Sequence, residues 1–323
     1  MDKTLKVVVI GGGTGQSTIL RGIKQIENIE ITAIVTVADD GGSTGRLRRA
    51  YHIPAMGDIR NVMIALSESE TLFSTLMSYR FEKDDLAELD AENELVGHNL
   101  GNIILTALTK KTGSFMDAVT TISKVLNVKG DIVPSTHQVV RLIARMEDGT
   151  IVRGESNIPK SRHRIQEVFY DEKVVGSHEA VRAIEKADFI ILGIGSVYTS
   201  ICPNIIIPEI QKALKKNQGK KIYVANAMTQ AGETDGYTLE DHVNAIEKHA
   251  NIKLDIVIAA NDEIPLEILQ RYIVEEAFPV RIQDKVHNYQ LIRRKLLNFE
   301  SKRVRHDPER IKTIIEEIIR KNT

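Results

Sequence analysis

The sequence predicts an α/β fold with a doubly wound, mostly parallel sheet and an inserted antiparallel hairpin subdomain. Three observations lead to this prediction. Short apolar runs rich in Val and Ile alternate with amphipathic helical stretches, several of those runs end in glycine-rich or polar loops, and residues 128–175 read instead as neighbouring antiparallel strands. We expect residues 1–323 to form one domain, with 128–175 as an insertion within it.

Five buried strands are expected along the chain. Their apolar runs are almost unbroken and rich in β-branched residues, which is typical of parallel strands covered on both faces. Each run stops at small or polar residues, as the first one does at Gly11–Gly15. The expected strands are Val7–Ile10, Ile31–Val37, Phe189–Leu192, Ile222–Ala225 and Ile256–Ala260.

Helical patterns separate these strands. They cover residues 58–66, 100–108, 205–216 and 238–248, and the last opens with Thr238–Asp241, which has the form of a capping box. Asp307 and Pro308 suit the N-cap and first turn of a C-terminal helix. That helix has one apolar stripe, typical of docking on a core, formed by Ile311, Ile314, Ile315, Ile318 and Ile319.

The inserted segment is expected to contain a hairpin. Gln138–Met146 and Thr150–Gly154 have strand character, and they flank the short glycine-containing connection Glu147–Gly149. Elsewhere, the alternation of strands and helices indicates right-handed crossovers. Sheets built in this way bind ligands outside the carboxyl ends of their strands. Since the polar and glycine-rich loops fall at those ends, we expect them to share one crevice.

Composition excludes several classes of function. Lys and Arg number 43 and Asp and Glu 44, so the formal charge is -1 and there is no basic excess of the kind that nucleic-acid binding normally requires. The only cysteine is Cys202, so an intramolecular disulfide cannot form. The N-terminus has no signal-peptide pattern, and no apolar run is long enough to cross a bilayer. We therefore expect a cytoplasmic protein without membrane insertion.

The loop after the first strand is the first predicted ligand site. It leads directly into a helix, whose unpaired N–H groups can hold a phosphate. The dinucleotide fingerprint would need glycine where Thr18 stands, and a P-loop would need lysine where Gln16 stands. A tight structural turn is the alternative. The predicted contacts in this loop are Gly12, Gly13, Thr14, Gly15 and Ser17.

The second strand ends in two adjacent carboxylates, Asp39 and Asp40, followed by Gly41 and Gly42. Such acids accept hydrogen bonds from ribose hydroxyls or hold Mg²⁺ through oxygen ligands. An exposed turn is the alternative, because Asp and Gly are common in turns. If the protein is an enzyme, these two residues and Asp58 are the candidate catalytic groups.

Later loops add further candidates. Two helix starts, at 57–61 and 97–102, offer N–H groups and polar side chains, with a structural role as the alternative. Ser196 is not expected to be a triad nucleophile, because the G-x-S-x-G elbow is absent. Cys202 is expected to be a buried, packed thiol and not a nucleophile. The predicted ligand contacts in these loops are Arg60, Asn61, His98, Asn99, Asn102, Gly195, Ser196, Tyr198, Thr199, Asn226, Thr229 and Gln230.

Seven ordered motifs together resemble the CofD-like superfamily and, within it, the YvcK-type gluconeogenesis factors. They are GGGTGQSTILRG, TAIVTVADDGGSTGRLR, GDIRN, GHNLGN, GES, GIGSVYTSICPN and NAMTQAGETDGYT, and RHDP near the C-terminus extends the match. The resemblance implies a Rossmann-like sheet with an anion-binding crevice. By family analogy, Tyr272 and Arg305 are expected to contact the sugar or base. The chain departs from the usual pattern at Gln16, Asn99 and Ile194, where Leu, Ser and Pro are expected.

The resemblance implies two functions. YvcK-type relatives look like UDP-sugar-binding regulators of cell shape and wall synthesis during growth on gluconeogenic carbon sources. CofD itself transfers a phospholactyl group from a guanine nucleotide to a deazaflavin with the help of Mg²⁺. The first function is our main hypothesis, and a Mg²⁺-dependent transferase is the alternative. A homodimer and cell-wall or kinase regulatory partners are left open. The dinucleotide-binding fingerprint is incomplete because Thr18 stands where it requires glycine, which argues against a nicotinamide dehydrogenase.

Overall fold

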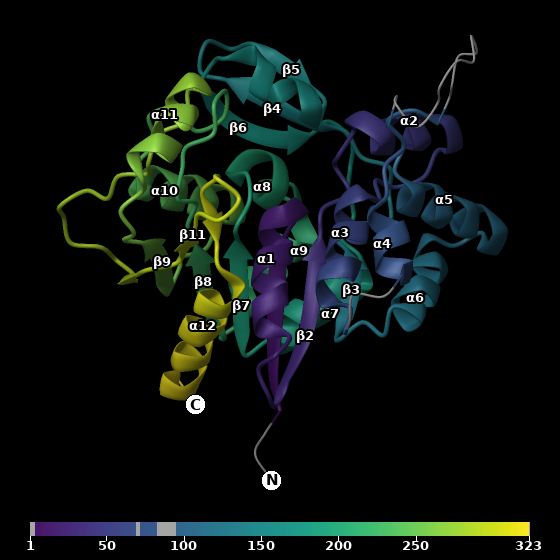
Figure 1. The fold of residues 1–323 in the computed structure, drawn as a ribbon, viewed down its shortest axis with the longest axis horizontal. Coiled ribbons are helices and arrows are strands. Elements are labelled where there is room, and N and C mark those ends of the chain that lie inside the picture. The colour runs from purple at the N-terminus through teal and green to yellow at the C-terminus, as the bar shows by residue number, and fades with distance from the viewer. Residues whose placement is uncertain (1–3, 69–71, 83–94, 323) are drawn as a thin grey trace.

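The computed structural model describes residues 4–68, 72–82 and 95–322 (Figure 1). At its centre is a seven-stranded sheet with the order β10-β9-β8-β7-β1-β2-β3, in which each pairing is parallel. The sheet strands are Leu5–Gly11 (β1), Ile29–Val35 (β2), Asp131–Pro134 (β3), Phe189–Gly193 (β7), Lys220–Val224 (β8), Ile256–Ala260 (β9) and Gln290–Arg294 (β10). The predicted doubly wound parallel sheet is therefore confirmed.

The direction of winding reverses beside β1. From β1 the chain builds outward through β2 and β3, and then returns to place β7, β8, β9 and β10 on the other side. Loops on either side of such a reversal leave in opposite directions, which opens a crevice at the carboxyl ends of the strands. The reversal lies between β1 and β7, and both strands end in glycine-rich loops.

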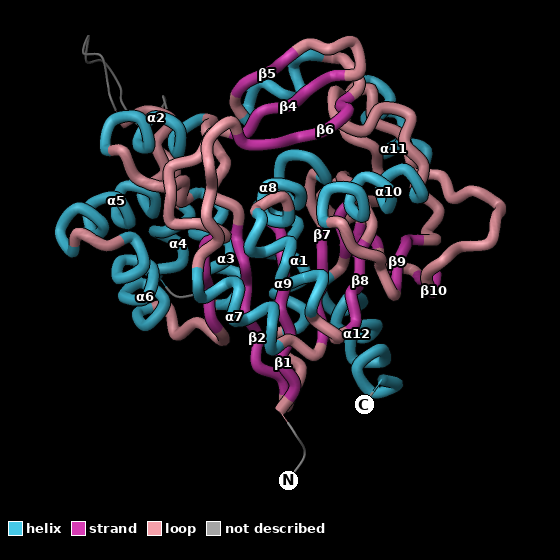
Figure 2. The backbone as a smooth tube through the Cα atoms, turned by 180° about the vertical axis from the view of Figure 1, so that it is seen from behind, coloured by secondary structure: helices cyan, strands magenta, loops and turns pink. Residues whose placement is uncertain are grey.

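Helices cover both faces of the sheet (Figures 1 and 2). On one face α1 packs against α3 and α12, and on the other α7 packs against α9. The helices are Gly13–Ile23 (α1), Gly42–Tyr51 (α2), Gly57–Leu66 (α3), Leu72–Ser78 (α4), Leu100–Thr112 (α5), Phe115–Val125 (α6), His178–Lys186 (α7), Cys202–Ile205 (α8), Pro208–Lys216 (α9), Leu239–Ala250 (α10), Leu266–Val274 (α11) and Pro308–Asn322 (α12). The single helix predicted over 205–216 is instead two, because the chain bends before Pro208 and that residue begins α9.

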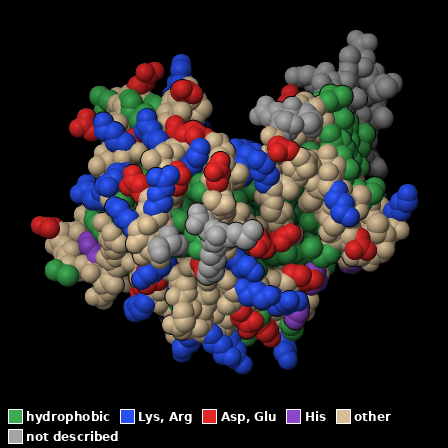
Figure 3. Space-filling view, turned by 90° about the horizontal axis from the view of Figure 1, so that it is seen from below, with side chains coloured by type: hydrophobic (Ala, Val, Ile, Leu, Met, Phe, Trp, Pro, Cys, Tyr) green, Lys and Arg blue, Asp and Glu red, His purple; other side chains and the backbone are tan. Residues whose placement is uncertain are grey.

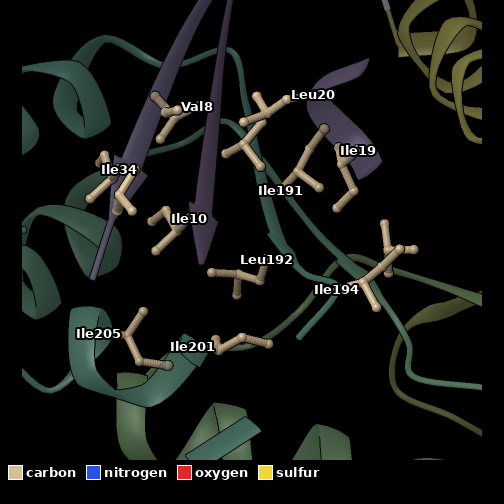
Figure 4. Close-up of a cluster of buried hydrophobic side chains, with 14 of the residues drawn as sticks. Val8, Ile10, Ile19, Leu20, Ile34, Ile191, Leu192, Ile194, Ile201 and Ile205 are labelled. Atoms are coloured by element: carbon tan, nitrogen blue, oxygen red, sulfur yellow. The ribbon is translucent and has the colours of Figure 1, made fainter. Parts of the chain in front are cut away.

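The core lies directly beneath the crevice. Figure 4 shows side chains of β1, β2 and β7 meeting those of α1 and of the segment that contains Ile201 and Ile205. Ile10, Ile34 and Leu192 are fully buried there. Each such side chain contributes about 1.5–3 kcal/mol to stability by leaving water. The strand ends that carry the polar loops are thus fixed on a rigid base.

The C-terminal helix is attached as its sequence predicts. Asp307 Oδ1 accepts hydrogen bonds from the N–H groups of Glu309 and Arg310, and the predicted isoleucine stripe is buried. The helix packs on α1, where a Cβ atom added at Gly22 would lie 2.2 Å from the carbonyl oxygen of Pro308. Only glycine permits this close approach of the two backbones.

A three-stranded antiparallel sheet lies above the carboxyl ends of the main sheet (Figures 1 and 2). It has the order β5-β4-β6 and is formed by Leu142–Met146 (β4), Ile151–Arg153 (β5) and Ile165–Tyr170 (β6). The predicted hairpin at Glu147–Gly149 joins β4 to β5. The insertion starts later than the predicted residue 128, because β3 pairs in parallel with β2 and buries Ile132 and Val133 in the main core.

Charged side chains of both signs share the surface (Figure 3), in keeping with the formal charge of -1. The face seen in Figure 3 intersperses Lys and Arg with Asp and Glu. Among the described residues, no helix combines the length and the apolar character that crossing a membrane requires.

Candidate functional site

The glycine loops after β1 and β7 touch each other at the reversal of the sheet. A Cβ atom added at Gly15 would lie 2.1 Å from the carbonyl oxygen of Ile194, and one added at Gly195 would lie 3.6 Å from that of Gly12. Gly13 has φ +62°, which an L side chain rarely adopts. The close contact between the loops therefore needs glycine at position 15, and this contact brings the start of α1 to the crevice.

A pocket of about 600 Å³ opens beside these two loops, and we call it the β1/β7 pocket. Its wall combines the start of α1 with the ends of β7 and β8, with α11 and with the segment before α12. Of the predicted ligand contacts, it is lined by Thr14, Gly15, Gly195, Ser196, Asn226, Gln230, Tyr272 and Arg305. Residues separated by almost the whole chain thus form one concave surface.

Hydrogen bonds hold the polar side chains of this pocket in place. Asn226 Nδ2 donates to the carbonyl oxygen of Gly195 at 2.8 Å, and its Oδ1 accepts from the hydroxyl of Tyr223 at 3.0 Å. The Tyr272 hydroxyl accepts from the N–H of Val304 at 3.0 Å, which positions the segment that carries Arg305. The pocket is therefore organised by its own residues before any ligand enters.

The charge of the β1/β7 pocket is positive. Arg21 and Arg305 line it, and none of the described residues that line it is Asp or Glu. The start of α1 adds N–H groups at the positive end of a helix dipole. Asp58 accepts from the N–H of Gly13, and the first turn of α1 itself contains no acidic residue. These are the features of a site for an anion.

A second and smaller cavity of about 220 Å³ lies at the starts of α2 and α3, and we call it the α2/α3 cavity. Asp39 and Asp58 line it together with Arg60 and Arg80. The Asp58 carboxyl also packs against the first glycine loop, where a Cβ atom added at Gly12 would lie 2.6 Å from Asp58 Oδ2. Other predicted contacts that line this cavity are Gly41, Gly42, Asn61 and Asn102.

Four buried acids, Asp39, Asp58, Glu155 and Glu233, have raised pKa values in this part of the molecule. Burial, and then the charge of Asp39, raises the pKa of Asp58 to about 7. Burial also raises the pKa of Asp39, and it raises the pKa of Glu155 to about 8, with the charges of Asp39 and Glu233 adding to the effect. Burial raises the pKa of Glu233 to about 7. Several of these carboxyl groups therefore hold protons near neutral pH, a property that is frequent at functional sites.

The adjacent carboxylates Asp39 and Asp40 point to different places. Asp39 lines the α2/α3 cavity and its Oδ1 accepts from the N–H of Gly41, whereas Asp40 Oδ1 accepts from the N–H of Ser156 in the insertion. Within the described residues, no three His, Cys, Asp or Glu side chains come together in a way that would hold a metal ion. Asp39 and Asp58 are the pair that fits Mg²⁺, which typically takes one or two carboxylates and completes its shell with water and phosphate oxygens.

Several predicted contacts instead use their side chains to shape the loops. Ser17 donates to the carbonyl oxygen of Gly13, and Thr229 accepts from the N–H of Phe278. Asn99 caps α5 through the N–H of Asn102. The remaining side chains of this kind are those of His98, bonded to Ser43, Tyr198, bonded to Tyr237, and Thr199, bonded to Glu233.

The structure also brings residues to the crevice that are not among the predicted ligand contacts. Glu155 follows the insertion's Gly154, and Glu233 accepts hydrogen bonds from the Ser196 and Thr199 hydroxyls. Arg80 lies outside all of the motifs, so nothing in the sequence around it indicated a place at the site. For Glu155 a signal existed, because it lies in the GES stretch of the family resemblance.

Comparisons with known proteins agree on one family. The family model "2-phospho-L-lactate transferase CofD" matches residues 7–297. The protein named "Gluconeogenesis factor" from Bacillus subtilis is 43% identical over 325 residues, which cover 99% of this chain and 100% of that protein. A protein of the same name from Halalkalibacterium halodurans is 46% identical over 284 residues, covering 87% and 85%. A crystal structure of a protein from Bacillus halodurans has a TM-score of 0.91 and 42% identity, covering 97% of this chain and 100% of that one.

Proposed function

The chain belongs to the CofD family, and from that premise we propose that it is a regulatory protein of the gluconeogenesis-factor type that binds a UDP-sugar in the β1/β7 pocket. The observation that carries the proposal is the lining of this pocket. Helix N–H groups and two arginines meet in a space of about 600 Å³ without an acidic side chain among its described lining residues. A nucleoside diphosphate linked to a sugar is an anion of suitable size and charge.

Residues on different walls of the pocket would contact different parts of the ligand. The start of α1, with Thr14 and Gly15, would hold the diphosphate together with Ser196 from the opposite loop. Arg305 would neutralise charge from the C-terminal side, and Tyr272 would contact the base or sugar. Asn226 and Gln230 supply amide groups of the kind that recognise hydroxyls and base edges.

The proposal extends to the setting of the protein. The relatives' name supports a link to gluconeogenesis. The family resemblance adds the rest of the proposal, a role in cell shape and wall synthesis on gluconeogenic carbon sources, in the cytoplasm and through regulatory partner proteins. Binding of the UDP-sugar would report the supply of wall precursor to those partners.

Isothermal titration with UDP-N-acetylglucosamine tests the binding. The Arg305→Ala variant should bind about tenfold or more weakly, because a charge-assisted hydrogen bond to phosphate is lost. The matched control is Arg320→Ala, an exposed arginine of α12 that forms an ion pair with Glu316 one turn earlier and does not line the β1/β7 pocket. In the wild type, ligand at 100 times its Kd should stabilise the fold by about 2.7 kcal/mol. Equal affinities of wild type and Arg305→Ala, or no binding at millimolar ligand, would refute the proposal.

A CofD-like transferase is the second candidate, and the buried acids favour it. Asp39 and Asp58 lie beside the glycine loop, and the pKa of about 7 suits Asp58 to act as a general base. An acceptor hydroxyl would attack the distal phosphorus of a nucleotide donor while its proton passes to Asp58. The bond from that phosphorus to the nucleotide would break, and the nucleotide would leave with the bonding electrons. Mg²⁺ held by Asp39, with water and phosphate oxygens completing its shell, would supply charge neutralisation.

Mass spectrometry of nucleotide released from GTP- or UTP-derived donors, with Mg²⁺ and candidate acceptors, tests this second function. Release should require an acceptor and should fall at least about a hundredfold in Asp58→Asn, since general bases contribute about 10²–10⁴ to rate. Release that is unchanged in Asp58→Asn would remove this role from the residue.

A further inference from the structure

The helix α11 presents large apolar side chains to solvent at an outer edge of the molecule (Figure 1). Of its residues only Ile268 is buried, whereas Leu266 is 69% exposed and Val274 is 85% exposed. Ile273 and, just after the helix, Phe278 are each 47% exposed. Single apolar side chains on a surface are ordinary, but several gathered on one helix mark a contact surface.

Helix geometry places these side chains in one patch. At about 100° per residue, Leu266, Ile273 and Val274 point away from the buried Ile268 and surround Gln270. The helix α12 shows the ordinary arrangement, in which the apolar stripe is buried and charged residues face solvent. The second apolar side of α11, formed by Leu266, Gln270, Ile273 and Val274, is here named the α11 face.

Two side chains of opposite charge border the α11 face. Glu267 and Arg271 are exposed, lie one turn apart and share the same border. Neither of them forms an ion pair with another residue that the structure describes. By contrast, Glu275 near the end of the helix already pairs with Arg303. The charges of Glu267 and Arg271 therefore remain available to a partner.

The pattern of the α11 face is complementary to itself. In a two-fold symmetric interface, residue i of one copy meets residue j of the other, and j meets i. When two α11 helices pack antiparallel with the axis at Gln270, Leu266 of each copy meets Val274 of the other. The same rotation keeps the charged border on one side, so Glu267 of each copy meets Arg271 of the other. A pair of Gln270 amides, which donate and accept, lies at the centre.

We propose that α11 is the contact surface of a homodimer, in which two copies of this chain pack antiparallel through the α11 face. An anionic lipid surface would need an excess of cations, but α11 and its flanks carry Glu263, Glu267, Glu275 and Glu276 against the single arginine of the helix. Nine residues of helix are only about 13 Å long, so the buried area is below the roughly 800 Å² per partner of a standard interface. The expected Kd is therefore about 1–100 µM.

The opposite side of the same helix reaches the β1/β7 pocket. Tyr272 lines that pocket, and its hydroxyl accepts from the N–H of Val304. A dimer through the α11 face would place one ligand pocket behind each of the two interface helices. Association itself needs no ligand, so the dimer and the proposed UDP-sugar function can fail separately.

Sedimentation velocity without ligand, over about 1–500 µM protein, tests the dimer. The wild type should change from 36.1 kDa to twice this mass as the concentration rises. Val274→Glu places a carboxylate in the apolar patch and should weaken association about tenfold or more. Val125→Glu is the matched control and should dimerise as the wild type does, because Val125 is also the last residue of its helix, α6, and is 60% exposed.

Exchange of the two charges tests the antiparallel geometry. Glu267→Arg alone and Arg271→Glu alone each bring like charges together, and each should weaken association about tenfold or more. The double variant restores both pairs and should dimerise as the wild type does, and a mixture of the two single variants should form a mixed dimer. The same exchanges at Glu316 and Arg320, an ion pair of α12 with the same spacing, should have no effect.

Three results would overturn the proposal. The first is a single species of 36.1 kDa at about 500 µM protein, which would assign the α11 face to a partner other than this chain. The second is wild-type association in Val274→Glu. The third is a double charge variant that associates no better than the single variants do.

Discussion

The buried carboxyl of Asp58 makes the stability of this protein depend on pH, and Asp58→Asn tests this directly. In the fold its pKa is raised from 3.8 to about 7, first by burial and then by Asp39. Below the unfolded value both states hold the proton, so there is no cost. As the pH rises toward 7 the folded chain retains a proton that the unfolded chain releases, and stability falls.

The magnitude follows from the two pKa values. Each pH unit between them corresponds to about 1.4 kcal/mol, so the cost is about 2 kcal/mol at pH 5 and about 4 kcal/mol at pH 8. Asparagine has a similar shape, and its Oδ1 can still accept from the N–H of Gly13. Asp58→Asn should therefore be more stable than the wild type, and the difference should grow by about 2–3 kcal/mol between pH 5 and pH 8.

Urea unfolding followed by circular dichroism measures this difference at each pH, since the chain has no Trp to serve as a fluorescent probe. The matched control is Asp117→Asn. Asp117 also lies in the first turn of a helix, α6, but it is exposed. The control should lose about 0.3–1 kcal/mol at all these pH values. A gain in Asp58→Asn that does not change with pH would refute the reasoning.

Three further substitutions test the packing around the crevice. Gly15→Ala would place a Cβ atom 2.1 Å from the carbonyl oxygen of Ile194, so titration should detect at least tenfold weaker UDP-sugar binding, and unchanged affinity would contradict the described contact. Gln16→Leu removes the donor to the carbonyl oxygens of Val9 and Ile34, which destabilises, and also removes a buried Oε1 without a partner, which stabilises. Because the two effects offset each other, the free energy of unfolding measured in urea should change by no more than about 1 kcal/mol. Ile315→Ala should cost about 2–5 kcal/mol in the same assay because Ile315 is buried against the core, and a loss below 1 kcal/mol would show that α12 is not docked as described.

Periodicity predicted the strands and helices where one physical signal dominates. The unbroken run Val7–Ile10 is buried on both faces, and the capping box at Thr238 is present with both of its hydrogen bonds. β10 was not predicted, because Gln290–Arg294 is an edge strand with polar and half-exposed residues and lacks the unbroken apolar run of a central strand. β3 was assigned to the insertion because sequence alone does not say which strand a short apolar run pairs with.

For the site, the sequence predicted which loops meet but not where each side chain points. The convergence of Thr14, Gly195 and Asn226 follows from parallel strands that end at one edge. Tyr198 and Thr229 lie in the same loops, yet their hydroxyls bond to Tyr237 and to the N–H of Phe278. Such orientations depend on local backbone geometry and on partners distant in sequence, for which neither spacing nor residue type provides a signal.

The wall of the β1/β7 pocket begins at Thr14 and ends at Pro308, and the intervening chain forms most of the molecule. A ligand bound at both places would be a reversible, non-covalent cross-link between the two ends of this stretch of chain. When the protein is pulled by its two ends, α12 and the segment before it can separate from α1 only after the ligand has dissociated from one of these two places. Ligand binding should then raise the force at which the first unfolding event occurs, so this unfolding force would differ between the free and the ligand-bound protein.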